Sequence, residues 1–124
     1  MARYTEWEIV FAWMPNTDGS PPPYRHRCIY LSESAKRPGA MVMIGITSSL
    51  TEWVDGYSVD LPFSSVPGGH EITHLTKRSF AQAHWNDHLM PSEIGDVSGY
   101  VPPEFRDPIL RAIERYIKDK RNRN

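Results

Sequence analysis

Short apolar runs alternate along the chain with stretches rich in proline, glycine and polar residues. In the first run, Ile9 and Phe11 fall on one face of an expected strand and Val10 and Ala12 on the other, because successive side chains of a strand point in opposite directions. The 11 prolines punctuate the apolar runs, as is typical of a small β-rich domain with many turns. The strands that this pattern predicts span residues 6–14, 25–31, 40–47, 57–61, and 79 to 84 or beyond.

The C-terminal segment has a different period. Its apolar residues recur at helical spacing, at Ile109, Leu110, Ile113, Tyr116 and Ile117. Asp107 is the expected N-cap and Pro108 fits the first turn, whereas residues 118–124 are charged and polar and are expected to fray. The pattern predicts a mainly-β (α+β) protein with one C-terminal helix, in which residues 1–124 form a single domain.

Overall charge does not mark this chain as a nucleic-acid binder. Charged residues make up 23% of the sequence and the formal net charge is −1, so any contact with nucleic acid must be local. The single cysteine, Cys28, lies in an apolar strand, and no apolar segment near the start of the chain reads as a signal or membrane span. These features predict a reduced, cytoplasmic protein without a membrane segment.

Polar clusters stand at the ends of the predicted strands. Residues 16–20 follow the first strand, Arg25 begins the second, and residues 47–49, Thr-Ser-Ser, end the third. One fold can bring an arginine and a row of hydroxyls together over a rigid sheet, which is a common way to bind a phosphate. The sequence therefore favours phosphodiester chemistry.

In these segments the chain resembles the MazF/PemK family of bacterial toxins, the mRNA interferases of type II toxin-antitoxin pairs. The second segment has His26 where the family usually has proline. The resemblance extends over most of the chain, and its segments taken together are moderately specific. They are residues 8–20, 25–31, 46–49, 75–83, and 94–95 with the terminal helix.

This resemblance implies a compact SH3-like β-barrel, a homodimer with RNA in a groove at the dimer interface, and an antitoxin partner. It also implies RNA cleavage without metal or other cofactor, in which a ribose 2′-hydroxyl attacks the neighbouring phosphate. By position, Arg25 would stabilise the transition state, Thr47 would hydrogen-bond a phosphate oxygen, and Ser48 could assist. The candidate RNA contacts are Thr17, Asp18, Arg27, Trp53, Lys77 and Arg78.

The sequence departs from the family pattern at several positions. Where some members carry an arginine and an aspartate two residues apart, this chain has Gln82 and His84. Trp7 replaces the glycine that usually precedes the first strand. His84 is therefore a candidate replacement proton carrier, because imidazole titrates near neutral pH.

A rival motif predicts a zinc hydrolase. Residues 70–74, His-Glu-Ile-Thr-His, match a zinc-protease pattern in which both histidines share a helix face, and Glu93 is a possible third ligand. Residues 67–69, Pro-Gly-Gly, directly precede the motif and disfavour the helix that it needs. His84 and His88 are a weaker metal pair, since in a strand they would lie ~13 Å apart. Our prediction is that the chain binds no metal.

A third possibility is a toxin-fold protein that binds a protein target without catalysis, as the gyrase poison CcdB does. That protein ends in a tryptophan-bearing helix. We find no counterpart in residues 119–124.

Overall fold

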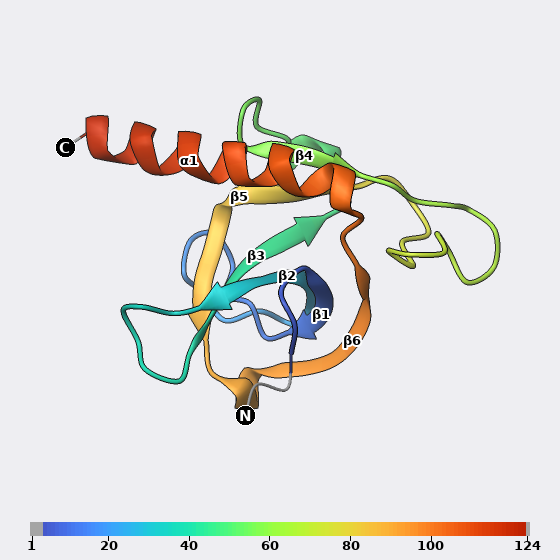
Figure 1. Cartoon of the computed structure of the whole chain (residues 1–124), viewed down its shortest axis with the longest axis horizontal. Coiled ribbons are helices and arrows are strands. Elements are labelled where there is room, and N and C mark those ends of the chain that lie inside the picture. Colours follow the sequence, from blue (N-terminus) through green and yellow to red (C-terminus); the bar gives the residue numbers. More distant parts are fainter. Residues whose placement is uncertain (1–3, 124) are drawn as a thin grey trace.

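The computed structural model describes residues 4–123 and contains a curved antiparallel sheet with the order β4-β5-β3-β2-β1-β6. The sheet curls so that β5 and β6 lie on opposite sides of the three central strands (Figure 1). Among the described residues the one α-helix is α1 (Arg106–Asn122), which follows the short turn η3 (Pro103–Phe105). The strands are β1 (Glu8–Ala12), β2 (His26–Glu33), β3 (Met41–Thr47), β4 (Ser58–Leu61), β5 (Ser79–Leu89) and β6 (Ile94–Tyr100). The predicted mainly-β fold with a C-terminal helix is confirmed.

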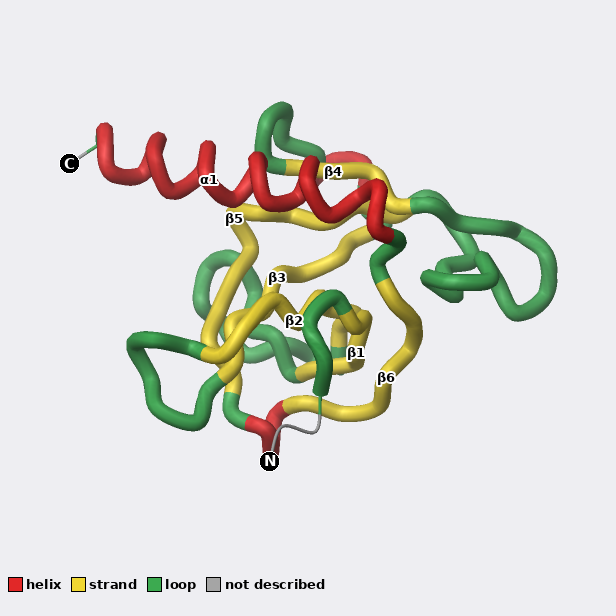
Figure 2. The backbone as a smooth tube through the Cα atoms, viewed as in Figure 1, coloured by secondary structure: helices red, strands yellow, loops and turns green. Residues whose placement is uncertain are grey.

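The central strands are buried on both faces. Ile9 pairs with Ile29, which pairs with Ile44, and all three belong to one apolar cluster. The next residue of β1, Val10, belongs to a second cluster. Helix α1 covers the first cluster through Ile109 and lies across β4 and β5 (Figure 2). Alternation of side chains along each strand thus builds two cores from one sheet.

An irregularity in β5 shapes the second face of the sheet. Pairing with β3 passes from Ile44↔Asn86 to Gly45↔Gln82, so residues 83–85 lie outside the regular ladder. Trp85 consequently lies over Gly45, where an added Cβ would be 2.0 Å from the indole Cε3 atom. The indole Nε1 donates to the Pro15 carbonyl at 2.7 Å, which ties β5 to the loop after β1.

Several predicted strand limits were wrong. β1 is shorter than residues 6–14, because Trp7 occupies a turn with φ +73° and the chain leaves the ladder after Ala12. Strand β6 was not predicted as a strand, since its sequence, IGDVSGY, is poor in apolar residues. By contrast, β5 agrees with the prediction of a strand from residue 79 to 84 or beyond, since it continues to Leu89 and includes His88.

Helix α1 also differs from its prediction at both ends. The N-cap is Phe105 rather than Asp107, because η3 leads directly into the helix, and Asp107 lies in the first turn, where its charge complements the helix dipole. Pro108 stands in the first turn as predicted. The helix extends to Asn122, so residues 118–122, expected to fray, are helical, and Asn124 lies outside the described residues. None of the described helices is long and apolar enough to cross a membrane.

Candidate functional site

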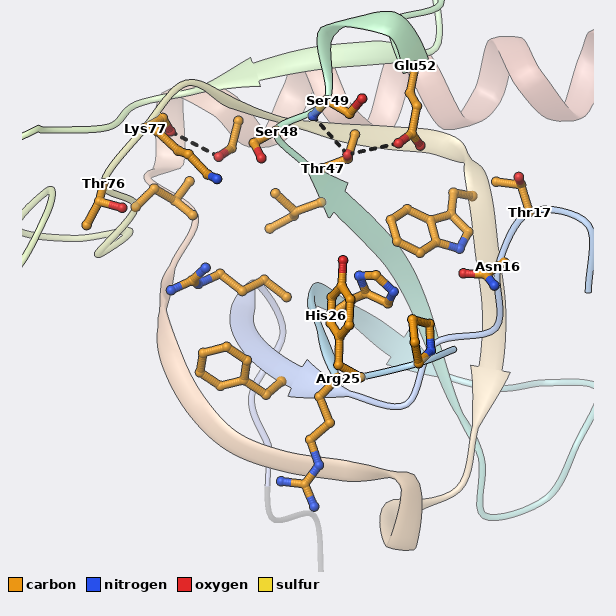
Figure 3. Close-up of a pocket in the computed structure, with 18 residues that line it drawn as sticks. Asn16, Thr17, Arg25, His26, Thr47, Ser48, Ser49, Glu52, Thr76 and Lys77 are labelled. Carbon is orange, nitrogen blue, oxygen red and sulfur yellow. Dashed lines mark hydrogen bonds between the residues drawn. The ribbon is translucent and has the colours of Figure 1, made fainter. Parts of the chain in front are cut away.

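A cavity of about 570 Å³ opens where β2 begins and β3 ends (Figure 3). It combines cations, hydroxyls and aromatic rings contributed by segments far apart in the sequence. Its lining comprises Phe11, Asn16, Thr17, Pro23, Tyr24, Arg25, His26, Arg27, Ile46, Thr47, Ser48, Ser49, Glu52, Leu75, Thr76, Lys77, Ser79 and Trp85.

The end of β3 fixes the Thr47 hydroxyl. Thr47 Oγ1 accepts a hydrogen bond from the Ser49 backbone N–H at 3.1 Å and donates to Glu52 Oε1 at 3.4 Å (Figure 3). Glu52 stands in the short turn η1 (Leu50–Glu52) directly after the Thr-Ser-Ser segment. These local contacts hold the hydroxyl at the cavity wall, on a strand that the sheet keeps rigid.

The cavity also has a histidine in its lining, His26, which the sequence did not single out as a site residue. Cys28 pairs with Gly45. The β2–β3 ladder ends at this pair, and beyond it His26 at the start of β2 and Thr47 at the end of β3 both line the cavity. His26 lines the cavity, and its ring lies 5.0 Å from the Trp85 ring, edge to face, and 4.8 Å from the Tyr24 ring. In the sequence, His26 was notable only because it stands where the resembled family usually has proline. That replacement did not show where the side chain would lie.

Positive charge is concentrated at this cavity although the whole chain is slightly acidic. Arg25, Arg27 and Lys77 line it together with one carboxylate, Glu52. Arg27 Nε donates to Ser98 Oγ at 3.4 Å, and its guanidinium carbon lies 5.0 Å from the Phe11 ring centre. This concentration matches the expected local attraction for a polyanion.

The backbone of Arg25 lies beside the cavity, but the guanidinium of its side chain points away from Thr47 (Figure 3). The guanidinium carbon lies 5.6 Å from the centre of the Trp13 ring, which is itself 41% exposed. The backbone of Arg25 and the hydroxyl-bearing residues therefore lie around the same cavity, as predicted, but the guanidinium is not directed at the hydroxyls. In the conformation described here, the charge of Arg25 rests at the rim.

The structure separates the other predicted contacts into two groups. Thr17, Arg27, Ser48 and Lys77 line the cavity with Arg25 and Thr47, whereas Asp18, Trp53, Arg78 and His84 do not. Asp18 accepts hydrogen bonds from the Ser20 side chain at 2.6 Å and from its backbone N–H at 2.9 Å. These bonds lower the pKa of the Asp18 carboxyl, which is occupied within its own loop.

Trp53 and Arg78 form a separate surface group. The Trp53 ring packs edge to face on Phe80 at 5.0 Å, and the Arg78 guanidinium carbon lies 5.6 Å from the Trp53 ring centre. Arg78 also makes two hydrogen bonds to Asp60, at 2.9 and 3.2 Å. Both side chains are engaged with neighbouring protein groups rather than directed into the cavity.

His84 lies on β5 against Tyr57, with 5.8 Å between the ring centres. Its Nδ1 atom is buried without a hydrogen-bond partner, and burial lowers the pKa of the imidazole despite an opposing effect of Glu52. Gln82 is fully buried, and neither atom of its amide has a partner. Neither Gln82 nor His84, two of the departures from the family pattern, lines the cavity.

The rival zinc motif occupies a turn rather than a helix. His70 Nδ1 accepts hydrogen bonds from the backbone N–H groups of Ile72 at 3.1 Å and Thr73 at 3.3 Å, so a neutral His70 ring carries its proton on Nε2. His74 has φ +59°, and its Nδ1 lies 2.6 Å from the Ser98 carbonyl. Glu93 Oε1 accepts the Met90 backbone N–H in another part of the fold. No group of three or more potential ligands is present within residues 4–123.

No protein-family model and no curated protein sequence matches the chain. Solved structures do match over nearly its whole length. An endoribonuclease in complex with its cognate antitoxin, from Mycobacterial species, is 14% identical with a TM-score of 0.67, over 93% of this chain and 95% of that one. A second endoribonuclease from Mycobacterial species is 15% identical with a TM-score of 0.61, over 92% and 91%. The chain therefore shares the fold of these endoribonucleases.

Proposed function

We propose that this protein is the toxin of a type II toxin-antitoxin pair, an endoribonuclease that cleaves RNA without a metal ion and thereby inhibits growth. The observation that carries this proposal is the cavity itself, which Arg25, Arg27 and Lys77 line together with Thr47, whose hydroxyl is fixed by hydrogen bonds. The fold shared with two endoribonucleases supports the same chemistry.

The chemistry needs charge neutralisation and alignment. The ribose 2′-hydroxyl attacks the adjacent phosphorus as the bond to the 5′-oxygen breaks, which leaves a cyclic phosphate and a free 5′-hydroxyl. A planar guanidinium with five donors suits the charge that develops on the phosphate oxygens, and both Arg25 and Arg27 are available for this role. Thr47 and Ser48 supply hydroxyls to the same oxygens, and the exposed Tyr24 ring offers a stacking surface for a base.

Incubation of the purified protein with a long RNA, with and without a chelator, tests this proposal. We expect cleavage at the same rate in both samples, and products that carry a cyclic phosphate and a 5′-hydroxyl by end-group analysis. Cleavage that stops in the chelator and returns with zinc would instead support metal-dependent hydrolysis. Intact RNA in every sample would exclude an RNA-cleaving activity and leave a non-catalytic toxin-fold protein.

The partner proposal concerns the same cavity. An inhibitory antitoxin with an acidic and apolar tail would cover the cations Arg25 and Arg27 and bind the exposed Trp13 at the rim. The next residue, Met14, cannot contribute to this rim, because its side chain is fully buried.

We expect the Arg25→Ala/Arg27→Ala double variant to bind such a partner at least 10-fold more weakly than the parent, since two charge contacts are removed. Titration calorimetry with the protein encoded next to this one measures the difference. The Arg111→Ala variant, altered on the exposed face of α1, is the matched control and should bind like the parent. Equal affinities for parent and double variant would place the partner on another surface.

A further inference from the structure

We propose that His26 is the group that accepts the proton of the attacking 2′-hydroxyl, and that Glu52 positions this proton transfer. The proposal rests on the function proposed above and assigns a residue that differs from the family's usual proline. It also transfers the expected role of proton carrier from His84 to His26. Of these two histidines, only His26 lines the cavity.

The geometry brings His26 to the place where a scissile phosphate would bind. His26, at the start of β2, lines the same cavity as Thr47, at the end of β3, the residue proposed to hold a phosphate oxygen. Thr47 in turn hydrogen-bonds to Glu52, and Glu52 lines the cavity as well. A substrate held by the Thr47 hydroxyl would therefore have its ribose within reach of the imidazole.

The imidazole is held in place and has an unused nitrogen. Its ring meets Trp85 edge to face, and Trp85 is itself fixed by its hydrogen bond to the Pro15 carbonyl. The Nε2 atom of His26 is screened from solvent and has no hydrogen-bond partner. Buried polar atoms are nearly always paired, so an unpaired ring nitrogen is unusual here, and a substrate hydroxyl would reach it through a small rotation of the ring.

The surroundings favour the neutral, basic form of His26 at neutral pH. Burial lowers the pKa of the His26 imidazole, and the negative charge of Glu52 opposes this effect. The other charged or titratable groups of the cavity are Arg25, Arg27 and Lys77, whose charges are positive, and Tyr24. His84, on β5, does not line the cavity, and the negative charge of Glu52 also acts to raise the pKa of its imidazole. A neutral imidazole can accept a proton, whereas an imidazolium cannot.

The proposed step balances without any added reagent. As the bond between the 2′-oxygen and phosphorus forms, the 2′-hydroxyl proton passes to a ring nitrogen of His26. The bond between phosphorus and the 5′-oxygen breaks, and the leaving oxygen takes a proton from water. The imidazolium then returns its proton to water, so that the enzyme regains its initial state.

The test combines rates and direct titration. The His26→Asn variant is expected to cleave RNA about 10²–10⁴-fold more slowly and to lose the acid limb of the pH profile of kcat/KM. In Glu52→Gln the acid limb should move to lower pH, because the charge that raises the His26 pKa is gone. The His74→Asn variant, changed at an exposed turn outside the cavity, is the control and should keep the parental rate and profile.

NMR titration of the His26 ring protons in the parent protein gives a measurement that does not depend on a variant folding. Its midpoint should coincide with the acid limb of kcat/KM. An active parent whose acid limb differs from that midpoint, or a folded His26→Asn protein with parental rate and profile, would overturn the proposal and leave the endoribonuclease function standing. A parent that cleaves no RNA would instead reject the proposed function itself.

Discussion

Arg25→Ala should lower the rate of RNA cleavage about 10²–10³-fold, the usual effect of removing one group that stabilises transition-state charge. In the free protein the guanidinium rests against Trp13, and we expect a bound phosphate to draw this exposed side chain into the cavity. The free energy of unfolding should change by less than about 0.5 kcal/mol, because an exposed side chain contributes little to packing. Single-turnover cleavage and thermal unfolding measure the two quantities.

The matched control for Arg25→Ala is Arg111→Ala, which removes an equal charge from an exposed site on α1. It should cleave RNA at the parental rate. Arg27→Ala separates the two arginines of the cavity, since Arg27 already contacts Ser98 beside it. A fully active Arg25→Ala protein together with an inactive Arg27→Ala protein would move the catalytic charge from Arg25 to Arg27.

Gly45→Ala is expected to destabilise the fold by about 1–3 kcal/mol, as overpacking of a dense core generally does. The added Cβ would lie 2.0 Å from the Trp85 indole, which is a rigid ring held by the Pro15 carbonyl. The indole must move, and the edge-to-face contact with His26 should move with it. Thermal unfolding should show a Tm that is lower by roughly 4–12 °C, and Trp85 fluorescence should change.

Gly95→Ala provides the comparison for Gly45→Ala, because both glycines lie in strands without a left-handed φ. A Cβ at Gly95 would first meet Arg25 Nη1, at 2.7 Å, the far end of a flexible side chain that can rotate away. We therefore expect the smaller loss of stability for Gly95→Ala. Equal losses, or a stable Gly45→Ala protein with unchanged fluorescence, would show that the Trp85 ring is free to shift.

The structure explains how Trp7 is accommodated at a position where the resembled family usually has glycine. The sequence placed tryptophan where the resembled family has glycine, and the backbone there has φ +73°, a conformation that glycine adopts readily. The Trp7 ring packs against the cluster of Ile9 and lies 5.8 Å from the Arg106 guanidinium carbon. Packing of a large ring at the base of α1 offsets the backbone strain.

The sequence by itself determined most of the elements and part of the site. The apolar run around Ile9 and Val10 indicated a strand, and the spacing from Ile109 to Ile117 indicated the helix. Local order also placed Thr47 at a strand end, because the polar residues that follow an apolar run are visible in the sequence. These features depend on residues close together in the chain, and the spacing of apolar and polar residues in a sequence reports such local structure.

Only the tertiary structure decided which distant residues meet. The polar strand β6 exists because β1 offers it a pairing edge, and His26 and Thr47 share a cavity because β2 begins and β3 ends at the same place in the sheet. The bulge in β5 brings Trp85 over Gly45, and the turn at residues 70–74 prevents the zinc motif from presenting its histidines on one helix face. Register and bulges are set by backbone pairing and packing between segments remote in sequence, and spacing along one chain does not encode them.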